Sequence, residues 1–265
     1  MAAARDGIDA WQERRAIACK LRPEHALDEF PDAEKFLADR GMLTSTPCCS
    51  LPSLFGACHE EPHSPGKGGF GQYPKTRWWW DEALEESSGV TRVKIHKGKS
   101  LFLTAGVAAI ADPRCRAETD LAADRAYGVT AARIVALLRA AGPSMTDDLK
   151  DELGLDAREY QSVRRKLDAR GVIVARHLEV AAANGGHRHV SELALWEQRV
   201  APSRATKDPL AGLVVAAVAA AVVMPEADAR RAFTWPVPAD LIDELVEGRE
   251  LTRIADGVLA RDSPV

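Results

Sequence analysis

Arginine and glutamine side chains are spaced along 157–170 so that they could read DNA bases. At about 100° per residue, Arg158, Gln161 and Arg165 fall on one helical face, and Arg164 lies on its flank. Arginine and glutamine recognise guanine and adenine edges in the major groove. The commoner alternative is that such charged side chains only keep an exposed helix solvated. We nevertheless expect this face to contact nucleic acid.

Further basic residues lie in two segments that alternate between apolar and polar positions. In 90–104 the alternation turns near Lys97-Gly98-Lys99, which predicts a β-hairpin with a basic edge. Lys94, Lys97 and Lys99 would contact phosphates there. His187 and Arg188 stand in a second predicted hairpin and would add contacts of the same kind.

Cysteine and histidine gather between positions 48 and 63, at Cys48, Cys49, Cys58, His59 and His63. Zinc takes four nitrogen or sulfur ligands, commonly with two to four residues between cysteines. Adjacent cysteines followed by a long gap do not fit that spacing, so small buried side chains are the favoured interpretation. The sequence predicts no metal and no cofactor.

Acidic, glycine and tryptophan residues follow that cluster. Glu60 and Glu61 could activate water, although solvated loop acids are more common. The glycine-rich loop 64–74 lacks the spacing of nucleotide-binding loops. The tryptophans at 78–80 cannot all face one core. One exposed indole could stack on a base or wedge into a duplex, while hydrophobic packing is the commoner use.

The elements that must position the first basic face form a predicted winged helix–turn–helix within 126–200. Apolar residues at helical spacing predict helices over 130–142 and 145–154, with Ser144 as the N-cap of the second. Asp156 would cap the third helix. The period then changes to two, which predicts a hairpin with its turn at 184–186.

The rest of the chain divides around that unit. Residues 1–125 form a predicted N-terminal α+β unit, 201–208 a linker, and 209–265 a second, abbreviated winged-helix-like unit. The third helix of this copy is acidic, so it is expected to mediate homodimerisation or bind a protein partner rather than DNA. The predicted fold class is α+β, mostly helical, with tandem winged helix–turn–helix units and short β-hairpin wings.

Bulk properties fit a protein of the cytoplasm. The 265 residues carry a net charge of −4 and five cysteines, an odd count that favours reduced thiols. No signal peptide is recognisable at the N-terminus. The longest apolar run, 210–224, is too short to cross a bilayer comfortably, so no membrane association is expected.

Several segments resemble the AlkZ-like (YcaQ-type) winged-helix DNA glycosylase superfamily, most of all its smaller AlkZ-related proteins. The likeness rests on the helix–turn–helix at 144–176 and on GMLTSTP, LPSLFGACHEEPH, VKIHKGKSLFLT and DPRCRAE. It implies a concave basic channel that holds double-stranded DNA carrying alkylated or crosslinked bases. It also implies hydrolysis of the N-glycosidic bond by a Gln-x-Gln or Gln-x-Asp pair.

The chain departs from the family at that catalytic pair. The aligned segment offers the hydroxyls of Thr44 and Thr46 in place of the amides. A hydroxyl lacks the paired donor and acceptor of an amide and orients water more weakly. If the chain hydrolyses DNA, the candidate catalytic residues are Thr44, Thr46, Glu60 and Glu61. The alternative is a non-catalytic transcriptional regulator or a protein-interaction scaffold.

Overall fold

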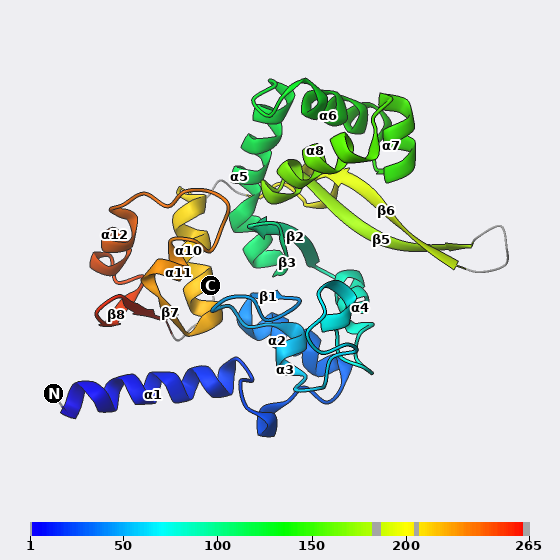
Figure 1. Ribbon diagram of the computed structural model, residues 1–265. Helices are drawn as coiled ribbons and strands as arrows, with labels where there is room; N and C mark the ends of the chain where they lie inside the picture. The colour runs from blue at the N-terminus through cyan, green and yellow to red at the C-terminus, as the bar shows by residue number, and fades with distance from the viewer. Residues whose placement is uncertain (1, 182–186, 204–206, 262–265) are drawn as a thin grey trace.

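The computed structural model describes residues 2–181, 187–203 and 207–261 (Figure 1). Within these residues the fold is α+β, as predicted, with three small antiparallel sheets of three strands each and helices packed around them. The predicted turn at 184–186 and part of the predicted linker, 204–206, lie outside the described residues.

Three units repeat one order of elements: helix, short strand, two helices, β-hairpin. The N-terminal unit (30–104) contains α2 (Phe30–Arg40), β1 (Met42–Thr44), α3 (Leu54–Ala57), α4 (Trp80–Glu86), β2 (Val90–His96) and β3 (Lys99–Thr104). The middle unit (129–195) contains α6 (Val129–Ala141), β4 (Ser144–Met145), α7 (Thr146–Leu153), α8 (Ala157–Ala169), β5 (Ile173–Ala181) and β6 (His187–Leu195). The C-terminal unit (209–260) contains α10 (Pro209–Ala221), β7 (Val223–Pro225), α11 (Glu226–Ala229), α12 (Leu241–Glu247), β8 (Thr252–Ala255) and β9 (Val258–Ala260).

The strand order is also the same in each unit. The short first strand pairs with the last strand of the hairpin, giving the orders β1-β3-β2, β4-β6-β5 and β7-β9-β8. The sequence pattern showed this element order only in the second and third of these units. It is hidden in the N-terminal unit because a long insertion, 58–79, separates α3 from α4.

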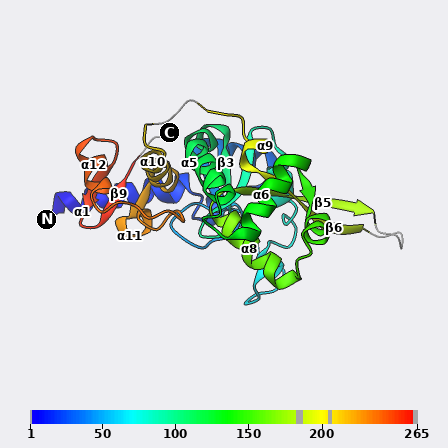
Figure 2. The same ribbon diagram turned by 90° about the horizontal axis from the view of Figure 1, so that it is seen from above.

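The remaining described elements connect or flank the units. They are α1 (Ala2–Ala18), the 3-10 helices η1 (Pro23–His25) and η2 (Gly69–Gln72), α5 (Ala105–Ala123) and α9 (Trp196–Arg199). Figures 1 and 2 both place the β5–β6 hairpin at one end of the molecule and α12 towards the other, with α5 between them.

The middle unit forms for the reasons that its sequence suggests. Asp156 caps α8 by accepting hydrogen bonds of 2.8 Å from the backbone N–H groups of Arg158 and Glu159. Tyr160 and Leu167 are fully buried on the inner face of α8. The prediction for Ser144 is wrong, because this residue lies in β4 and pairs with Leu193 of β6 instead of capping α7.

The dipeptide Asp112-Pro113 is typical of a turn in the sequence, but α5 runs through both residues. Proline inside a helix normally weakens it because one backbone donor is lost. Tertiary contacts hold this segment. The buried Asp112 carboxylate accepts hydrogen bonds from the indole of Trp196 at 2.8 Å and from the backbone N–H of Ser203 at 2.9 Å.

The units share cores. The largest core joins α5, the apolar helix α10 and the inner face of the N-terminal sheet, so residues 213–224 of the long apolar run are buried. Between the N-terminal and middle units the approach is close at Gly171, which has φ +67°. A Cβ there would lie 3.0 Å from the side chain of Ile95 in β2, and 2.6 Å from the sulfur of Cys115 in α5. In the described part of the chain, no helix has the length and apolar character needed to span a membrane.

Candidate nucleic-acid interface

A cleft of about 610 Å³ lies between α8 and the turn of the β2–β3 hairpin. Six of the residues predicted to contact DNA line it: Lys94, Lys97, Lys99, Gln161, Arg164 and Arg165. They come from two units that are separate in sequence, and the packing of α8 against β2 brings them together. The two basic groups of the sequence are therefore one surface in the fold.

The cleft is strongly basic although the chain carries a net charge of −4. Among the described residues that line it, five are lysine or arginine and only Asp168 is acidic. Lys97, Lys99 and Arg165 are exposed at its rim. Positive charge confined to a concavity focuses the electrostatic potential there, which attracts an anionic chain.

Asp168 offsets part of this charge from the floor of the cleft. Its carboxylate lies 3.6 Å from the ammonium of Lys94 and 3.5 Å from Nε of Arg164. Burial raises the pKa of Asp168, and the two neighbouring cations oppose that shift. Arg164 and Lys94 are thus held by the protein itself, whereas the rim cations face solvent.

The other residues predicted to contact DNA are Arg158 in α8 and two residues of the β5–β6 hairpin. Arg158 is exposed in the first turn of α8, next to Gln161 on the same face. His187 and Arg188 belong to β6, opposite Ala181 and Val180 of β5, so the hairpin prediction is confirmed. Their side chains lie outside the described part of the structure.

Two other basic residues of β2, Arg92 and His96, point inward. Arg92 is 11% exposed and forms ion pairs with Asp81 at 2.5 Å and Glu85 at 3.1 Å. His96 is buried, and its Nδ1 lies within hydrogen-bonding distance of the Ala232 carbonyl. Strand alternation does not explain this, because Arg92 and His96 have the same parity as Lys94, which lines the cleft. Arg92 is held inward by the two carboxylates of α4, which packs on β2, and the register of β2 shifts between Val93 and His96.

An aromatic pocket of about 220 Å³ adjoins the basic cleft, and His177 lines both. Phe70, Tyr73 and Trp78 form its apolar walls. Trp78 and Phe70 meet edge to face, with 5.9 Å between ring centroids, and remain 38% and 55% exposed. The prediction that at least one of the three adjacent tryptophans reaches the surface is confirmed.

The proposed catalytic hydroxyls lie at the end of β1 and just after it. Thr44 is 1% exposed, and its hydroxyl donates to the Pro52 carbonyl at 3.3 Å. Thr46 is half-buried in the following loop. Neither lines the basic cleft. The hydroxyl of Thr44 is committed to holding the loop that follows.

The two acidic candidates are committed to local ion pairs and hydrogen bonds. Glu60 accepts hydrogen bonds from the backbone N–H of Thr76 at 2.5 Å and its hydroxyl at 3.0 Å, and lies 3.4 Å from Arg77. Glu61 is 81% exposed and pairs with Lys75 at 2.7 Å. The hydrogen bond with Lys75 lowers the pKa of Glu61. These contacts fasten the two ends of the 61–75 loop together.

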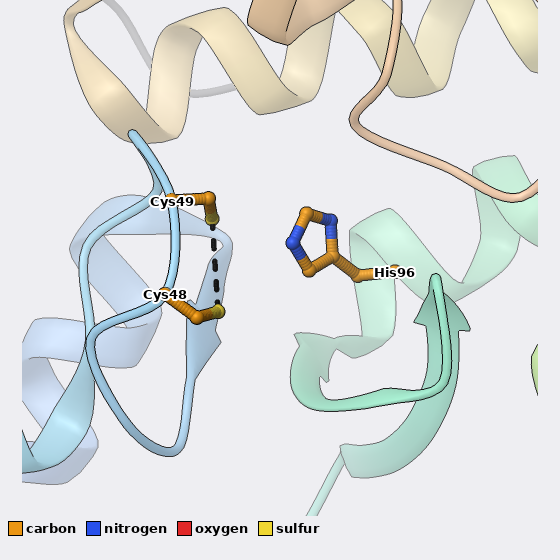
Figure 3. Close-up of side chains that lie close together, drawn as sticks. All are labelled: Cys48, Cys49 and His96. Carbon is orange, nitrogen blue, oxygen red and sulfur yellow. Dashed lines mark hydrogen bonds between the residues drawn. The ribbon is translucent and has the colours of Figure 1, made fainter.

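The structure assembles a different set of cysteine and histidine residues from the one that stands out in the sequence. Cys48 and Cys49 face His96 of β2, and their donor atoms all lie within 4.8 Å of one another (Figure 3). Hydrogen bonds from Cys49 and His96 lower the pKa of Cys48 to about 4, and the same contact raises the pKa of Cys49. No sequence signal links positions so far apart.

The other members of the sequence cluster have separate partners. Cys58 is buried, and its thiol donates to the Leu54 carbonyl at 3.4 Å. The ring of His59 contacts the Lys20 carbonyl, and the ring of His63 stacks on Phe70 with 4.8 Å between centroids.

Comparisons of the chain with protein-family models, with curated proteins and with solved structures found no match.

Proposed function

We propose that the protein binds double-stranded DNA, with one sugar–phosphate backbone in the cleft between α8 and the β2–β3 turn. The observation that carries this proposal is the convergence of five basic side chains from two units on one concave surface. In this proposal each of the three units is a winged helix–turn–helix. The shared order of elements and strands supports this assignment.

Within that arrangement α8 is the recognition helix. Its N-terminal half is exposed and presents Arg158 and Gln161, while its C-terminal half packs on β2 through Asp168 and Lys94. Recognition helices contact base edges with their N-terminal residues. Arg158 and Gln161 would therefore read bases, while Lys97, Lys99 and Arg165 would hold phosphates.

The role that we propose is binding without hydrolysis by the candidate catalytic residues. Thr44 and Glu60 each form hydrogen bonds within the protein, to the Pro52 carbonyl and the Thr76 N–H, and neither residue lines the basic cleft. This supports a regulator or a damage-binding protein over an enzyme that uses these residues. The acidic α12 exposes Asp243, Glu244 and Glu247. We therefore keep the prediction that the C-terminal unit mediates homodimerisation or binds a protein partner.

Fluorescence anisotropy with a labelled duplex tests the proposal across a series of salt concentrations. Each phosphate contact contributes about 0.9 to the slope of log affinity against log salt, so the three proposed phosphate contacts give a slope of about −2.7. A double variant, Lys97→Gln with Lys99→Gln, should reduce the magnitude of that slope by roughly 1.8.

Arg249→Gln provides the matched control, because Arg249 is an exposed arginine in the acidic C-terminal unit. It should bind DNA like the unmodified protein. Duplex affinity that does not change with salt would show the surface assignment to be wrong. So would a double variant that loses no more affinity than this control.

A further inference from the structure

Two sulfurs and one imidazole converge at the boundary between the N-terminal and C-terminal units. Cys48 and Cys49 follow β1, and His96 ends β2 (Figure 3). The two sulfurs lie 4.0 Å apart. Together with a ring nitrogen of His96 they form a group of three donor atoms, all within 4.8 Å of one another.

The separation of the two sulfurs is that of a tetrahedral coordination sphere. Zinc–sulfur bonds of about 2.3 Å in a tetrahedral site place two sulfurs roughly 3.8 Å apart. The observed 4.0 Å is close to that separation. A disulfide is a poor alternative, because adjacent Cα atoms are about 3.8 Å apart and disulfides prefer about 4.4–6.8 Å.

The backbone of the C-terminal unit fixes the orientation of the imidazole. Nδ1 of His96 donates to the Ala232 carbonyl. The next residue of that unit to contact β2 is Thr234, whose N–H and hydroxyl donate to the Ile95 carbonyl at 2.9 and 3.0 Å. Donation from Nδ1 leaves the lone pair on Nε2, the nitrogen that faces the sulfurs in Figure 3. Histidines that bind metals are commonly held by this type of hydrogen bond.

We propose that Cys48, Cys49 and His96 bind one Zn²⁺ ion, with the fourth coordination position open to water. Thiolate and imidazole ligands favour zinc over the hard cations magnesium and calcium. Both cysteines are exposed, so the ion can reach them from solvent. Its ligands belong to the N-terminal unit, and the carbonyl that orients His96 belongs to the C-terminal unit. The ion therefore fastens the two units together.

Zinc content and cobalt spectroscopy on the full chain test this site. The reduced protein is loaded with Zn²⁺, desalted and analysed by elemental mass spectrometry, and one zinc per chain is expected. Co²⁺ titrated into the metal-free protein should give a thiolate-to-cobalt charge-transfer band and tetrahedral d–d bands. Loss of a group that only hydrogen-bonds a metal ligand weakens metal binding by roughly 10–100-fold. Cys48→Ser and Cys49→Ser each remove a ligand itself, so each should weaken zinc binding by more than that.

The matched controls come from the neighbouring sequence cluster. Cys58→Ser and His63→Ala remove a thiol and an imidazole that lie outside the three-residue group, and both should bind zinc normally. Circular dichroism confirms that each variant is folded. Protection of Cys48 and Cys49 from alkylation by bound zinc, mapped by mass spectrometry, gives a readout on the unmodified chain.

Three results would overturn the proposal. One is a protein that retains no zinc after desalting. The second is zinc binding that survives in both serine variants. The third is a cobalt complex without the charge-transfer band, which would place the ion on carboxylates. Since none of these measurements involves DNA, their outcome is independent of the proposed DNA binding.

Discussion

The carboxylate of Asp168 in α8 lies 3.6 Å from the ammonium of Lys94 in β2, and this contact joins the two walls of the basic cleft. Asp168 is the only acidic side chain among the described residues that line the cleft. It therefore has two opposing effects. It holds the hairpin against α8, and it reduces the positive potential that DNA would meet.

Replacing Asp168 with asparagine should strengthen DNA binding. Loss of one negative charge beside the phosphate path should raise duplex affinity at low salt by roughly 3- to 10-fold, the size of one weakly screened charge interaction. Anisotropy measured at low and high salt checks this, and the gain should shrink as salt screens the charge. Unchanged affinity at low salt would mean that the DNA lies elsewhere.

The same variant should change the dependence of stability on pH. Burial raises the pKa of Asp168 above its ordinary value of 3.8, so the folded state binds this proton more tightly than the unfolded chain does. The resulting stabilisation is fully present below pH 3.8 and is lost as pH rises through the raised pKa. As pH rises from 3.8 through the raised pKa, the unfolding free energy of the unmodified protein should fall relative to that of Asp168→Asn. Urea titrations at a series of pH values measure it, and a flat difference would contradict the assignment.

Arg92 should be far more important for stability than its place in a basic strand suggests. It is nearly buried between Asp81 and Glu85, so Arg92→Gln leaves two carboxylates without their cation. Breaking a buried pair in this way costs about 3–5 kcal/mol. Arg176→Gln removes an exposed arginine that pairs with Glu86 at 3.5 Å, and should cost no more than about 1 kcal/mol. Equal losses for the two variants in urea unfolding would refute this difference.

Trp78 should contribute to binding of unpaired bases. It lines the aromatic pocket that shares His177 with the basic cleft, so a strand held in the cleft passes close to it. Loss of one stacking partner costs about 1–3 kcal/mol per base. Trp78→Ala should weaken single-stranded DNA binding by about 5- to 150-fold, the equivalent of that energy. Trp79→Ala is the control, since Trp79 packs on Phe30 with 5.5 Å between ring centroids. Similar losses for both would mean that the pocket does not receive bases.

Glu60→Gln should weaken the fold and leave DNA binding intact. Its carboxylate holds Thr76 and Arg77, and hydrogen bonds to a charged group contribute roughly 1.5–3 kcal/mol. The 81% exposed Glu61 is the control, and Glu61→Gln should change stability little. Neither the unmodified protein nor Thr44→Val should release a modified purine from alkylated duplex DNA. Release that is lost in folded Glu60→Gln and Thr44→Val proteins would instead assign catalysis to these residues.

The sequence predicts the elements whose causes lie within a few residues. The amphipathic spacing of Tyr160 and Leu167 and the cap at Asp156 predict α8, and the alternation in 90–104 predicts the β2–β3 hairpin. It also determined which cations reach the surface of α8, because a helical period assigns each residue to a face. Patterns within a few residues predicted the wrong secondary structure where contacts between distant segments determine it. Ser144 is a strand residue because β6 pairs with it, and α5 continues through Pro113 because Trp196 and Ser203 hold Asp112.

The tertiary fold sets which residues share a site. Lys97 lines the same cleft as Arg165 because α8 of the middle unit packs on β2. His96 lies beside Cys48 because β2 and the segment after β1 come together within the N-terminal unit. It also turned Arg92 inward and placed Asp168 under the cleft. Periodicity and capping depend on neighbours within a few residues. Contacts across the chain depend instead on how buried faces fit, which a single sequence does not display.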